Sequence, residues 1–364
     1  MKNLTPPPKN RTTVIRGSGM YVPPQVVTNE MMSRIMDTSD EWIVPRTGIR
    51  ERRFVTQGTG SADLGAEAAR AALAETGLDT DDIDFIIFAT MTPDYYFPGN
   101  GGLLADRLGM KRTHALDIRM QCAGFLSGLQ TADAFIRSGM YDRILLVGAE
   151  VHSALMPWPE PVWDVMLGKA PGPCDPEWYQ VATGMRDRAV LFGDGAGAFV
   201  LEANESGDGR GFLSFAMYTD GAHWDKLHVP GVGSRFRPYV NLEMVRHLDG
   251  IPIVEGRQVF RLATQLMPAA VLEVLSSRGR TLADLDLLLM HQANLRINEA
   301  AQKALGLPDG KVFNNIEKYG NTTAATLPMA FHEAKQAGRM KRGDLVGFAA
   351  LGAGLHWGAG LAVV

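Results

Sequence analysis

The chain has 364 residues, of which 46% are hydrophobic and 21% are charged. This length exceeds that of an average domain and the composition is that of a folded protein, so we expect one large two-part globule or two domains. The formal net charge of -4 gives no sign of the basic face that nucleic-acid binding needs. Two cysteines are too few for a disulfide framework, which favours a cytoplasmic protein.

The N-terminal residues 1–12 are rich in proline and polar side chains, and we expect them to form a flexible tail. They lack the basic start, the apolar stretch and the small-residue cleavage site of a signal peptide. No uninterrupted apolar run of about 18 residues occurs in the chain, so the sequence predicts no contact with a membrane.

Two similar helix–strand units lie far apart in the sequence. The first has a predicted helix over 62–76, with apolar residues at helical spacing, followed by an apolar run at 83–90. The second has a predicted helix over 260–277 followed by an apolar run at 285–292. Near-continuous apolar runs of this length are typical of strands that are covered on both faces.

The repetition predicts an internal duplication of a layered βαβ-rich unit. We expect an N-terminal half at 13–205 and a C-terminal half at 206–364, so the fold class is α/β with two related halves. Residues 152–187 have no counterpart in the second half and are rich in tryptophan, proline and glycine. They are expected to form a long inserted loop, and such loops often cover binding sites.

A cysteine at the start of a predicted helix is a candidate nucleophile. Unpaired backbone N–H groups and the helix dipole favour a thiolate at the position of Cys122, and the small residues of MQCAGFLSGL leave room for a substrate. Taken alone, a buried cysteine is more often an inert core residue. We give that interpretation to Cys174.

Two more polar residues lie at strand ends or helix starts of the duplicated units. His291 ends the second apolar run in MHQANLRI, and Asn321 lies in KYGNTTAATLP at a place equivalent to that of Cys122. Separately, they could be a core histidine and a helix N-cap. Because related halves bring equivalent positions to their shared axis, we expect Cys122, His291 and Asn321 to meet there.

The FGDGAGA segment could be mistaken for a phosphate-binding loop, but it lacks the Lys-Ser/Thr pair of a P-loop. Its β-rich flanks predict a hairpin instead. His223 and His228 have no partners at metal-ligand spacing, so we expect no metal and no cofactor.

Several segments together resemble the β-ketoacyl-acyl-carrier-protein synthase III family over roughly residues 13–364. They are DTSDEWIVPRTGIRERR (37–53), the Cys122 segment, FGDGAGA (192–198), HQANLRI (291–297), YGNTTAAT (319–326) and GAGLHWGAG (352–360). The resemblance implies the thiolase fold with five layers in the order αβαβα, and a homodimer. It also implies a ping-pong reaction, in which an acyl-CoA loads the cysteine and malonyl-acyl-carrier protein then condenses with loss of CO2.

The resemblance assigns roles to the candidate residues. Cys122 is the nucleophile, and the backbone N–H groups of Cys122 and Ala353 form the oxyanion hole. His291 and Asn321 stabilise the enolate that decarboxylation leaves. An acyltransferase or an acyl-CoA:acyl-CoA condensing relative remains an alternative, as does a catalytically silent partner subunit.

Further positions match the family's CoA site. Thr38, Trp42 and Arg46 match the patch that holds the adenine, where an indole and a guanidinium can both stack on a purine. A second stacking arginine is expected before FGDG, and spacing favours Arg186 while the local Asp-Arg dipeptide favours Arg188. The basic residues that meet CoA phosphates or carrier protein are matched by Arg296 and Lys303.

Phe97, in YYFPG, matches an aromatic ring that closes the acyl tunnel of the partner subunit in this family. A ring there favours short acyl groups, whereas the long insertion could move the partner chain and open a longer tunnel. Each buried methylene contributes about 0.8 kcal/mol, so we expect a medium-chain primer. At the position of Arg257, just before Val259 and Phe260, the family commonly has an asparagine, so the pantetheine contact at this position is in doubt.

Overall fold

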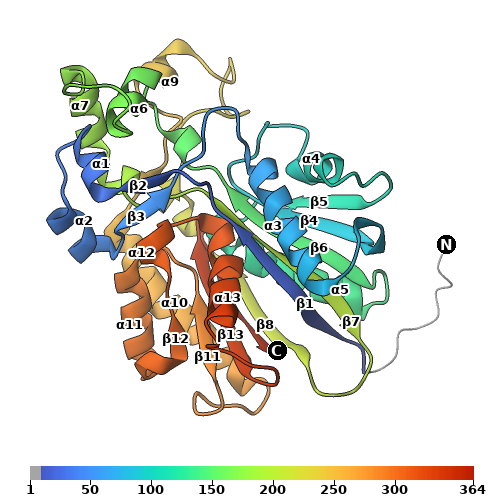
Figure 1. Ribbon diagram of the computed structural model, residues 1–364. Coiled ribbons are helices and arrows are strands. Elements are labelled where there is room, and N and C mark those ends of the chain that lie inside the picture. The colour runs from blue at the N-terminus through green and yellow to red at the C-terminus, as the bar shows by residue number, and fades with distance from the viewer. Residues whose placement is uncertain (1–9) are drawn as a thin grey trace.

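Two five-stranded sheets form the centre of the protein in the computed structural model, which describes residues 10–364 (Figure 1). The first sheet has the order β1 (Thr12–Tyr21), β7 (Gly195–Asn204), β6 (Arg143–Glu150), β4 (Phe85–Ala89), β5 (His114–Ile118). The second has the order β8 (Gly211–Thr219), β14 (His356–Val363), β13 (Leu345–Gly352), β11 (Leu287–Met290), β12 (Val312–Phe313). Two short pairs complete the strands: β2 (Val26–Thr28) with β3 (Glu51–Arg53), and β9 (Leu227–His228) with β10 (Ile253–Val254).

The two sheets have the same topology. Counted along the sequence, the first strand of each sheet pairs antiparallel with the fifth, and the fifth pairs antiparallel with the fourth. The remaining two pairings are parallel in both sheets. The chain passes from the first sheet to the second between β7 and β8, and the predicted duplication is confirmed.

The long helices form three layers around the two sheets (Figure 1). Two central helices lie between the sheets, and their apolar side chains form one core with both inner sheet faces. The outer faces are covered by separate pairs of helices. The five-layered αβαβα arrangement is therefore confirmed. The central helices are α5 (Gly124–Arg137) and α13 (Thr326–Gln336), and the outer ones are α3 (Ser61–Thr76) with α4 (Asn100–Arg107) and α10 (Gly256–Ser276) with α11 (Leu295–Leu305).

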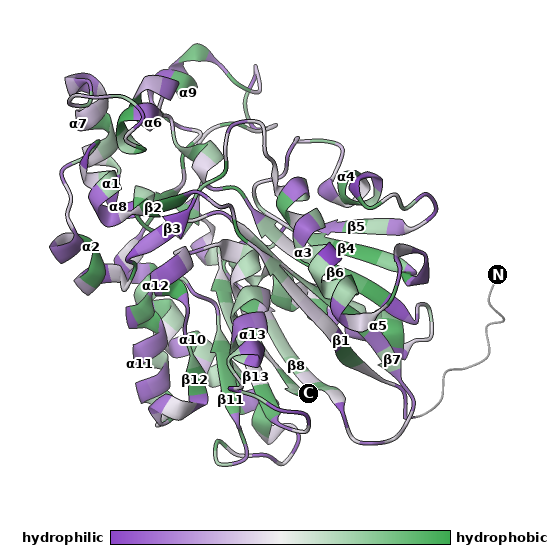
Figure 2. Ribbon diagram, in the orientation of Figure 1, coloured by the Kyte–Doolittle hydropathy of each residue, from purple (hydrophilic) through white to green (hydrophobic). Residues whose placement is uncertain are grey.

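The apolar runs that the sequence analysis assigned to strands are β4 and β11. All residues of both strands are buried, because helices cover each sheet on both faces. Figure 2 shows these strands largely green, while the exposed side of α11 is purple. By length and composition alone, α10 is the one helix among residues 10–364 that could span a membrane, and it packs against β13 and β14.

The insertion at 152–187 is not the irregular loop that we expected. It contains a short 3-10 helix (Ser153–Leu155) and two helices, α6 (Glu160–Met166) and α7 (Pro176–Gly184), and α8 (Arg186–Ala189) follows at its end. Prolines occupy the first turn of both α6 and α7, where a missing N–H costs nothing, and Asp175 caps α7. Two of the prolines that suggested a loop, Pro161 and Pro176, therefore lie in the first turns of helices.

These added helices pack against the N-terminal part of the chain. A cluster of buried apolar side chains joins them to α1 (Asn29–Ser33), α2 (Asp40–Thr47) and the β2–β3 pair, and we call it the cap cluster. The indole of Trp158 lies in it, 4% exposed, with its ring 5.0 Å from that of Trp163. Two short helices complete the chain: α9 (Leu242–Arg246) and α12 (Ile316–Tyr319).

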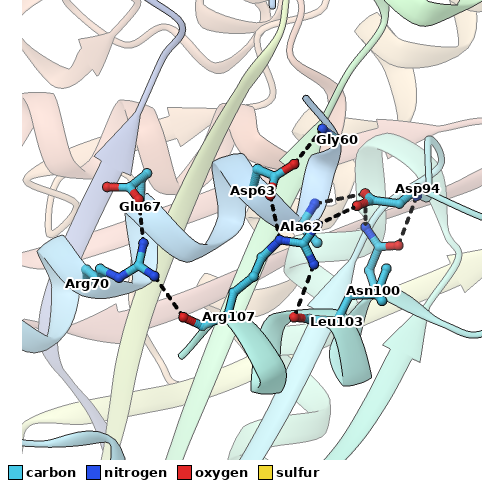
Figure 3. Close-up of polar contacts among 9 residues, drawn as sticks. All are labelled: Gly60, Ala62, Asp63, Glu67, Arg70, Asp94, Asn100, Leu103 and Arg107. Atoms are coloured by element: carbon cyan, nitrogen blue, oxygen red, sulfur yellow. Dashed lines mark hydrogen bonds and ion pairs between the residues drawn. The ribbon is translucent and has the colours of Figure 1, made fainter. Parts of the chain in front are cut away.

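A polar network fixes the loop between β4 and α4, which carries Phe97. The Asp94 carboxylate accepts hydrogen bonds from the backbone N–H of Ala62 and the side chain of Asn100, and it forms an ion pair with Arg107 (Figure 3). Arg107 also pairs with Asp63 at the start of α3. Both ends of the Phe97 loop are thereby tied to the outer helices of the first sheet.

Two smaller expectations need correction. The flanks of FGDGAGA do not form a hairpin, because the segment before it is α8 and a single bridge joins Phe192 to Asn321. A Cβ on Gly193 would lie 2.1 Å from the carbonyl oxygen of Tyr319, so the glycine permits close contact between the halves. The expected tail falls mostly outside the described residues, and Arg11 is already held by Asp142 and Glu205.

Candidate active site

Cys122 lies where the first sheet, the central helix α5 and the second half meet. It belongs to a 3-10 turn, η2 (Gln121–Ala123), that leads directly into α5. A Cβ on Gly352 would lie 2.9 Å from the backbone nitrogen of Cys122, so the absence of a side chain there lets the end of β13 approach the cysteine. Ala353, next in the chain, lines the same cavity as Cys122.

A second 3-10 turn, η6 (Thr323–Ala325), connects the three candidate catalytic residues. The Thr323 side chain lies close enough to the Cys122 thiol to lower its pKa. The backbone N–H of Thr323 donates to Oδ1 of Asn321 at 2.8 Å. Nδ1 of His291 lies 2.7 Å from the hydroxyl of Thr326, which follows the turn. The structure thus brings the predicted residues to one place at the boundary between the halves.

A cavity of about 830 Å³ opens at this place and is lined by Cys122, Asn321 and Ala353. The connection between β8 and α10 forms much of its wall, including Trp224 and Phe236. Its volume lies in the range of small-molecule sites, which is about 300–1,000 Å³. The cavity therefore has room for an acyl chain or the arm that carries it.

Burial controls the charge of the nucleophile. The pKa of the Cys122 thiol is raised to about 12, chiefly by removal from water and then by the carboxylate of Glu150, while Thr323 and the backbone act in the opposite direction. The expectation that a helix start favours the thiolate is therefore incomplete. In the structure without substrate, desolvation outweighs the helix dipole and the thiol is neutral.

His291 is also neutral. It lies directly after β11, and burial lowers its pKa to about 3. Nε2 is buried and has no hydrogen-bond partner among residues 10–364. The Thr326 hydroxyl reaches both Nδ1 of His291 at 2.7 Å and the carbonyl oxygen of Thr323 at 2.9 Å. Because this hydroxyl has one proton and donates it to the Thr323 carbonyl, it accepts from the Nδ1–H group of His291, and Nε2 carries the free lone pair.

Two buried carboxyl groups that the sequence analysis missed hold the site together. Glu150 ends β6 and accepts hydrogen bonds from the backbone N–H groups of Met91 and Thr92, and from that of Ala324 in η6. Burial raises the pKa of Glu150 to about 7. The signal was a lone acidic residue at the end of an apolar strand.

Asp194, in FGDGAGA, has a similar structural role. Its carboxylate accepts from the N–H groups of Val55 and Ser153 and from the Ser153 hydroxyl, and burial raises its pKa to about 6. Asp194 therefore fixes the chain just after β6. This fixed segment includes His152, a buried histidine that the sequence analysis did not single out.

The candidate CoA residues gather around the indole of Trp42 on α2. The guanidinium carbon of Arg46 lies 4.7 Å from the centre of this ring, and that of Arg186 lies 4.8 Å from it. Arg186 also forms an ion pair with Asp37 at 2.9 Å. Arg188 pairs with its neighbour Asp187 instead. Of the two arginines left open by the sequence, Arg186 is the one at Trp42.

The other candidate positions lie on the same side of the molecule or at its edge. The Thr38 hydroxyl is buried without a partner among residues 10–364. Arg296 and Lys303 are exposed on α11, and Arg296 lies over the ring of Phe260 at 5.7 Å. Phe97 is 81% exposed and does not line the cavity of its own chain, whereas Tyr96 does.

Among the described residues no group of three histidine, cysteine, aspartate or glutamate side chains is arranged to hold a metal ion. His228 lines the cavity, and His223 lies within 3.7 Å of Asp220.

Comparisons with known proteins agree with this architecture. The sequence profile of 3-oxoacyl-[acyl-carrier-protein (ACP)] synthase III matches residues 116–172 and 177–221, and the profile of its C-terminal part matches 275–364. The β-ketoacyl-[acyl-carrier-protein] synthase III of Sinorhizobium medicae is 42% identical over 350 residues, which span 95% of this chain and 98% of that protein.

Solved structures give the same result. The 3-oxoacyl-[acyl-carrier-protein] synthase III of Aquifex aeolicus VF5 superposes with a TM-score of 0.82 at 38% identity, over 97% of this chain and 100% of that one. A priming β-ketosynthase from the R1128 polyketide biosynthetic pathway reaches a TM-score of 0.83 at 30% identity, over 100% and 98% of the two chains.

The fold and these matches define a condensing enzyme of the thiolase fold, with acyltransferase chemistry. The chain belongs to the 3-oxoacyl-[acyl-carrier-protein] synthase III family.

Proposed function

We propose that the protein condenses an acyl-CoA primer with malonyl-acyl-carrier protein, with loss of CO2, to give a 3-oxoacyl-acyl-carrier protein. The observation that carries the proposal is the meeting of Cys122, His291 and Asn321 around the η6 turn, beside a cavity large enough for an acyl chain. The relatives named as synthase III support this activity. None of the comparisons favours another acceptor or a silent subunit.

In the first half-reaction the Cys122 sulfur attacks the thioester carbonyl carbon. A new S–C bond forms, the bond to the CoA sulfur breaks, and the proton lost from Cys122 ends on that sulfur. The negative oxygen of the intermediate needs fixed donors. The backbone N–H groups of Cys122 and Ala353 are suited to this role because both residues line the cavity around the sulfur.

In the second half-reaction the malonyl group loses CO2 and leaves an enolate, whose carbon attacks the carbonyl carbon of the acyl-cysteine. A C–C bond forms, the C–S bond to Cys122 breaks, and the released thiolate takes up a proton from solvent. The enolate oxygen requires hydrogen-bond donors. Because Oδ1 of Asn321 already accepts from Thr323, the amide Nδ2–H groups of Asn321 are free to donate. Nε2 of His291 is unpartnered, and it serves as the second donor once the Thr326 hydroxyl turns from the Thr323 carbonyl to Nδ1 and the ring proton moves to Nε2.

The CoA moiety is proposed to bind at the Trp42 end of the site. Its adenine would stack on the indole in place of the Arg186 guanidinium, which would move outwards to cover the other face of the purine, with Thr38 beside them. Arg296 and Lys303 would meet phosphate groups of CoA or of the carrier protein. This chemistry requires neither a metal ion nor a further cofactor.

We also propose a homodimer that works in the cytoplasm on medium-chain primers. Strand β5 is the last strand of its sheet and has only β4 as a neighbour among the described residues, so its outer edge is available to a second copy. The cavity volume supports a primer longer than acetyl. Both cysteines are free thiols, as expected in a reducing compartment.

Intact-protein mass spectrometry after mixing with single acyl-CoAs tests the proposed function. We expect an acyl adduct on wild-type protein and on Cys174→Ser, and none on Cys122→Ser. A panel of about two to twelve carbons compared by kcat/KM tests the chain length, since each buried methylene contributes about 0.8 kcal/mol. No adduct with any acyl-CoA would favour the silent subunit, and best activity with acetyl-CoA would refute the medium-chain primer.

A further inference from the structure

A second buried histidine lies next to the candidate nucleophile. His152 follows β6 by two residues and is 1% exposed. Its ring stacks on that of Phe192, with 4.4 Å between centroids and 21° between planes. Asp194 fixes the backbone of His152 by accepting from its N–H group. The backbone is therefore fixed and the ring packs behind Phe192, which lines the cavity.

The ring of His152 reaches Cys122 through one hydroxyl group. Nε2 lies 2.5 Å from Oγ1 of Thr323, and the same Thr323 side chain is close enough to the Cys122 thiol to lower its pKa. Nδ1 of His152 has no partner in the described part of the chain. A histidine that only fills the core would not need this connection to the nucleophile.

The number of protons on the threonine hydroxyl determines the direction of these hydrogen bonds. Thr323 has one hydroxyl proton and can donate only one hydrogen bond. If Nε2 of His152 donates to Oγ1, this proton is left for the Cys122 sulfur. A neutral His152 with its proton on Nε2 therefore turns the hydroxyl into a donor to the thiolate. Burial keeps the ring neutral, since it lowers the pKa of His152 to about 3.

We propose that His152 is a positioning residue for the first half-reaction. It orients the Thr323 hydroxyl towards the Cys122 sulfur and thereby stabilises the thiolate. The proposal rests on the proposed role of Cys122 as nucleophile. It explains how a sulfur that burial keeps protonated becomes reactive, because a preorganised donor favours the charged form. His152 itself touches neither the substrate nor the reacting atoms.

The pH dependence of Cys122 alkylation by iodoacetamide, followed by peptide mass spectrometry, tests this proposal without any substrate. Loss of the donor in His152→Leu should raise the thiol pKa and slow alkylation about 10-fold at a fixed pH below it, since one pKa unit is a factor of ten. His152→Gln, which keeps an N–H near the place of Nε2, should restore most of the rate. The matched control is His332→Leu, because His332 contacts the Ser18 hydroxyl at 3.0 Å outside the site.

A double-mutant cycle tests the route through the hydroxyl. In a Thr323→Val background, His152→Leu should have no further effect on the alkylation profile, because the connecting group is already missing. Equal alkylation profiles for wild type and His152→Leu would overturn the proposal. So would a His152→Leu effect that is as large in the Thr323→Val background as in wild type. A His152→Gln variant that is alkylated as slowly as His152→Leu would overturn it as well. If Cys122 accepts acyl groups but the alkylation profiles do not shift, only the role of His152 is refuted. If Cys122 accepts no acyl group, the proposed function is refuted.

Discussion

Thr323 adopts a φ of +51°, a left-handed conformation that residues other than glycine rarely take. Such strain persists only where surrounding contacts fix it, and here every polar group of the residue is used. The N–H group donates to Asn321, the carbonyl accepts from Thr326, and the hydroxyl lies between His152 and Cys122. One strained residue therefore sets the relative positions of the groups proposed to act in both half-reactions.

The role of Asn321 can be separated from that of the nucleophile. Asn321→Ala should still form acyl-Cys122, because the amide acts on the enolate and not on the first attack. Condensation should fall by about two orders of magnitude or more, since one preorganised donor contributes about 3 kcal/mol. Mass spectrometry measures the loading, and release of CO2 from malonyl-carrier protein measures the second step. Condensation at the wild-type rate would show that the assigned role is wrong.

The two buried histidines predict how stability depends on pH. Each is neutral in the folded state, with its pKa lowered by burial to about 3 from 6.5. Below pH 6.5 they therefore take up protons on unfolding, and their contribution to stability is lost as the pH falls. Burial raises the pKa of Glu150 and Asp194, so these carboxyls have the opposite dependence between about pH 7 and pH 4.

A variant isolates the contribution of one histidine. At pH 5 His152 should lower the free energy of unfolding by about 2 kcal/mol relative to pH 8, because unfolding then binds a proton. His152→Gln should remove this difference. Urea denaturation at a fixed protein concentration, at pH 5 and pH 8, compares the two proteins. An unchanged difference between the two pH values would mean that His152 is not held neutral.

At the scale of helices and strands, the sequence predicted those elements whose pattern is local. Helix α3 and strands β4 and β11 were found because apolar spacing along the chain reflects their burial. The helices of the insertion were missed because α6 and α7 are short, begin at prolines and are stabilised by the cap cluster. Such tertiary stabilisation leaves little periodicity in the sequence.

The candidate site, too, could be predicted only where its residues belong to local sequence patterns. Cys122, His291 and Asn321 occupy equivalent ends of duplicated elements, and the family resemblance named them. His152 and Thr323 were not found, because their contact joins residues that are 171 positions apart. No local pattern marks such a pair. Only the packing of the two halves brings them together.

The insertion has a predicted structural role in the cap cluster. Trp158→Ala should lower the free energy of unfolding by about 3–5 kcal/mol, because it leaves a large cavity beside Trp163. The order of preference among acyl-CoAs should not change, since the Trp158 ring does not line the cavity at Cys122. Trp178→Ala is a milder control, because that indole is only partly buried. A changed order of preference would show that the insertion also determines chain length.

On the scale of the whole molecule, the outer edge of β5 is, among residues 10–364, an unpaired sheet edge that could form an interface with a second chain. Exposed sheet edges pair readily with other chains. Leu116, at the centre of β5, is 38% exposed in the single chain. Leu116→Arg should therefore shift the protein from dimer to monomer in analytical ultracentrifugation, through desolvation of a charge at the interface. A monomeric wild-type protein, or an unchanged dimer of the variant, would contradict the proposed β5 interface.

The proposed dimer also gives Phe97 its proposed role, because its ring is 81% exposed, does not line the cavity of its own chain and is free to contact a neighbouring chain. If it closes the partner's acyl tunnel, Phe97→Ala should improve loading of longer acyl-CoAs without altering the stability of its own chain.

Heterodimers with a single active cysteine separate the two chains. When Phe97→Ala and Cys122→Ala are combined in one subunit and the other subunit is wild type, the only active Cys122 faces the truncated ring, and longer acyl groups should load more readily. When Phe97→Ala is placed instead in the subunit with the active cysteine, and Cys122→Ala alone in the other, the preference should match that of the wild-type dimer. The reverse pattern would place the action of Phe97 within its own subunit, and equal preferences in both heterodimers would remove it from the acyl site altogether.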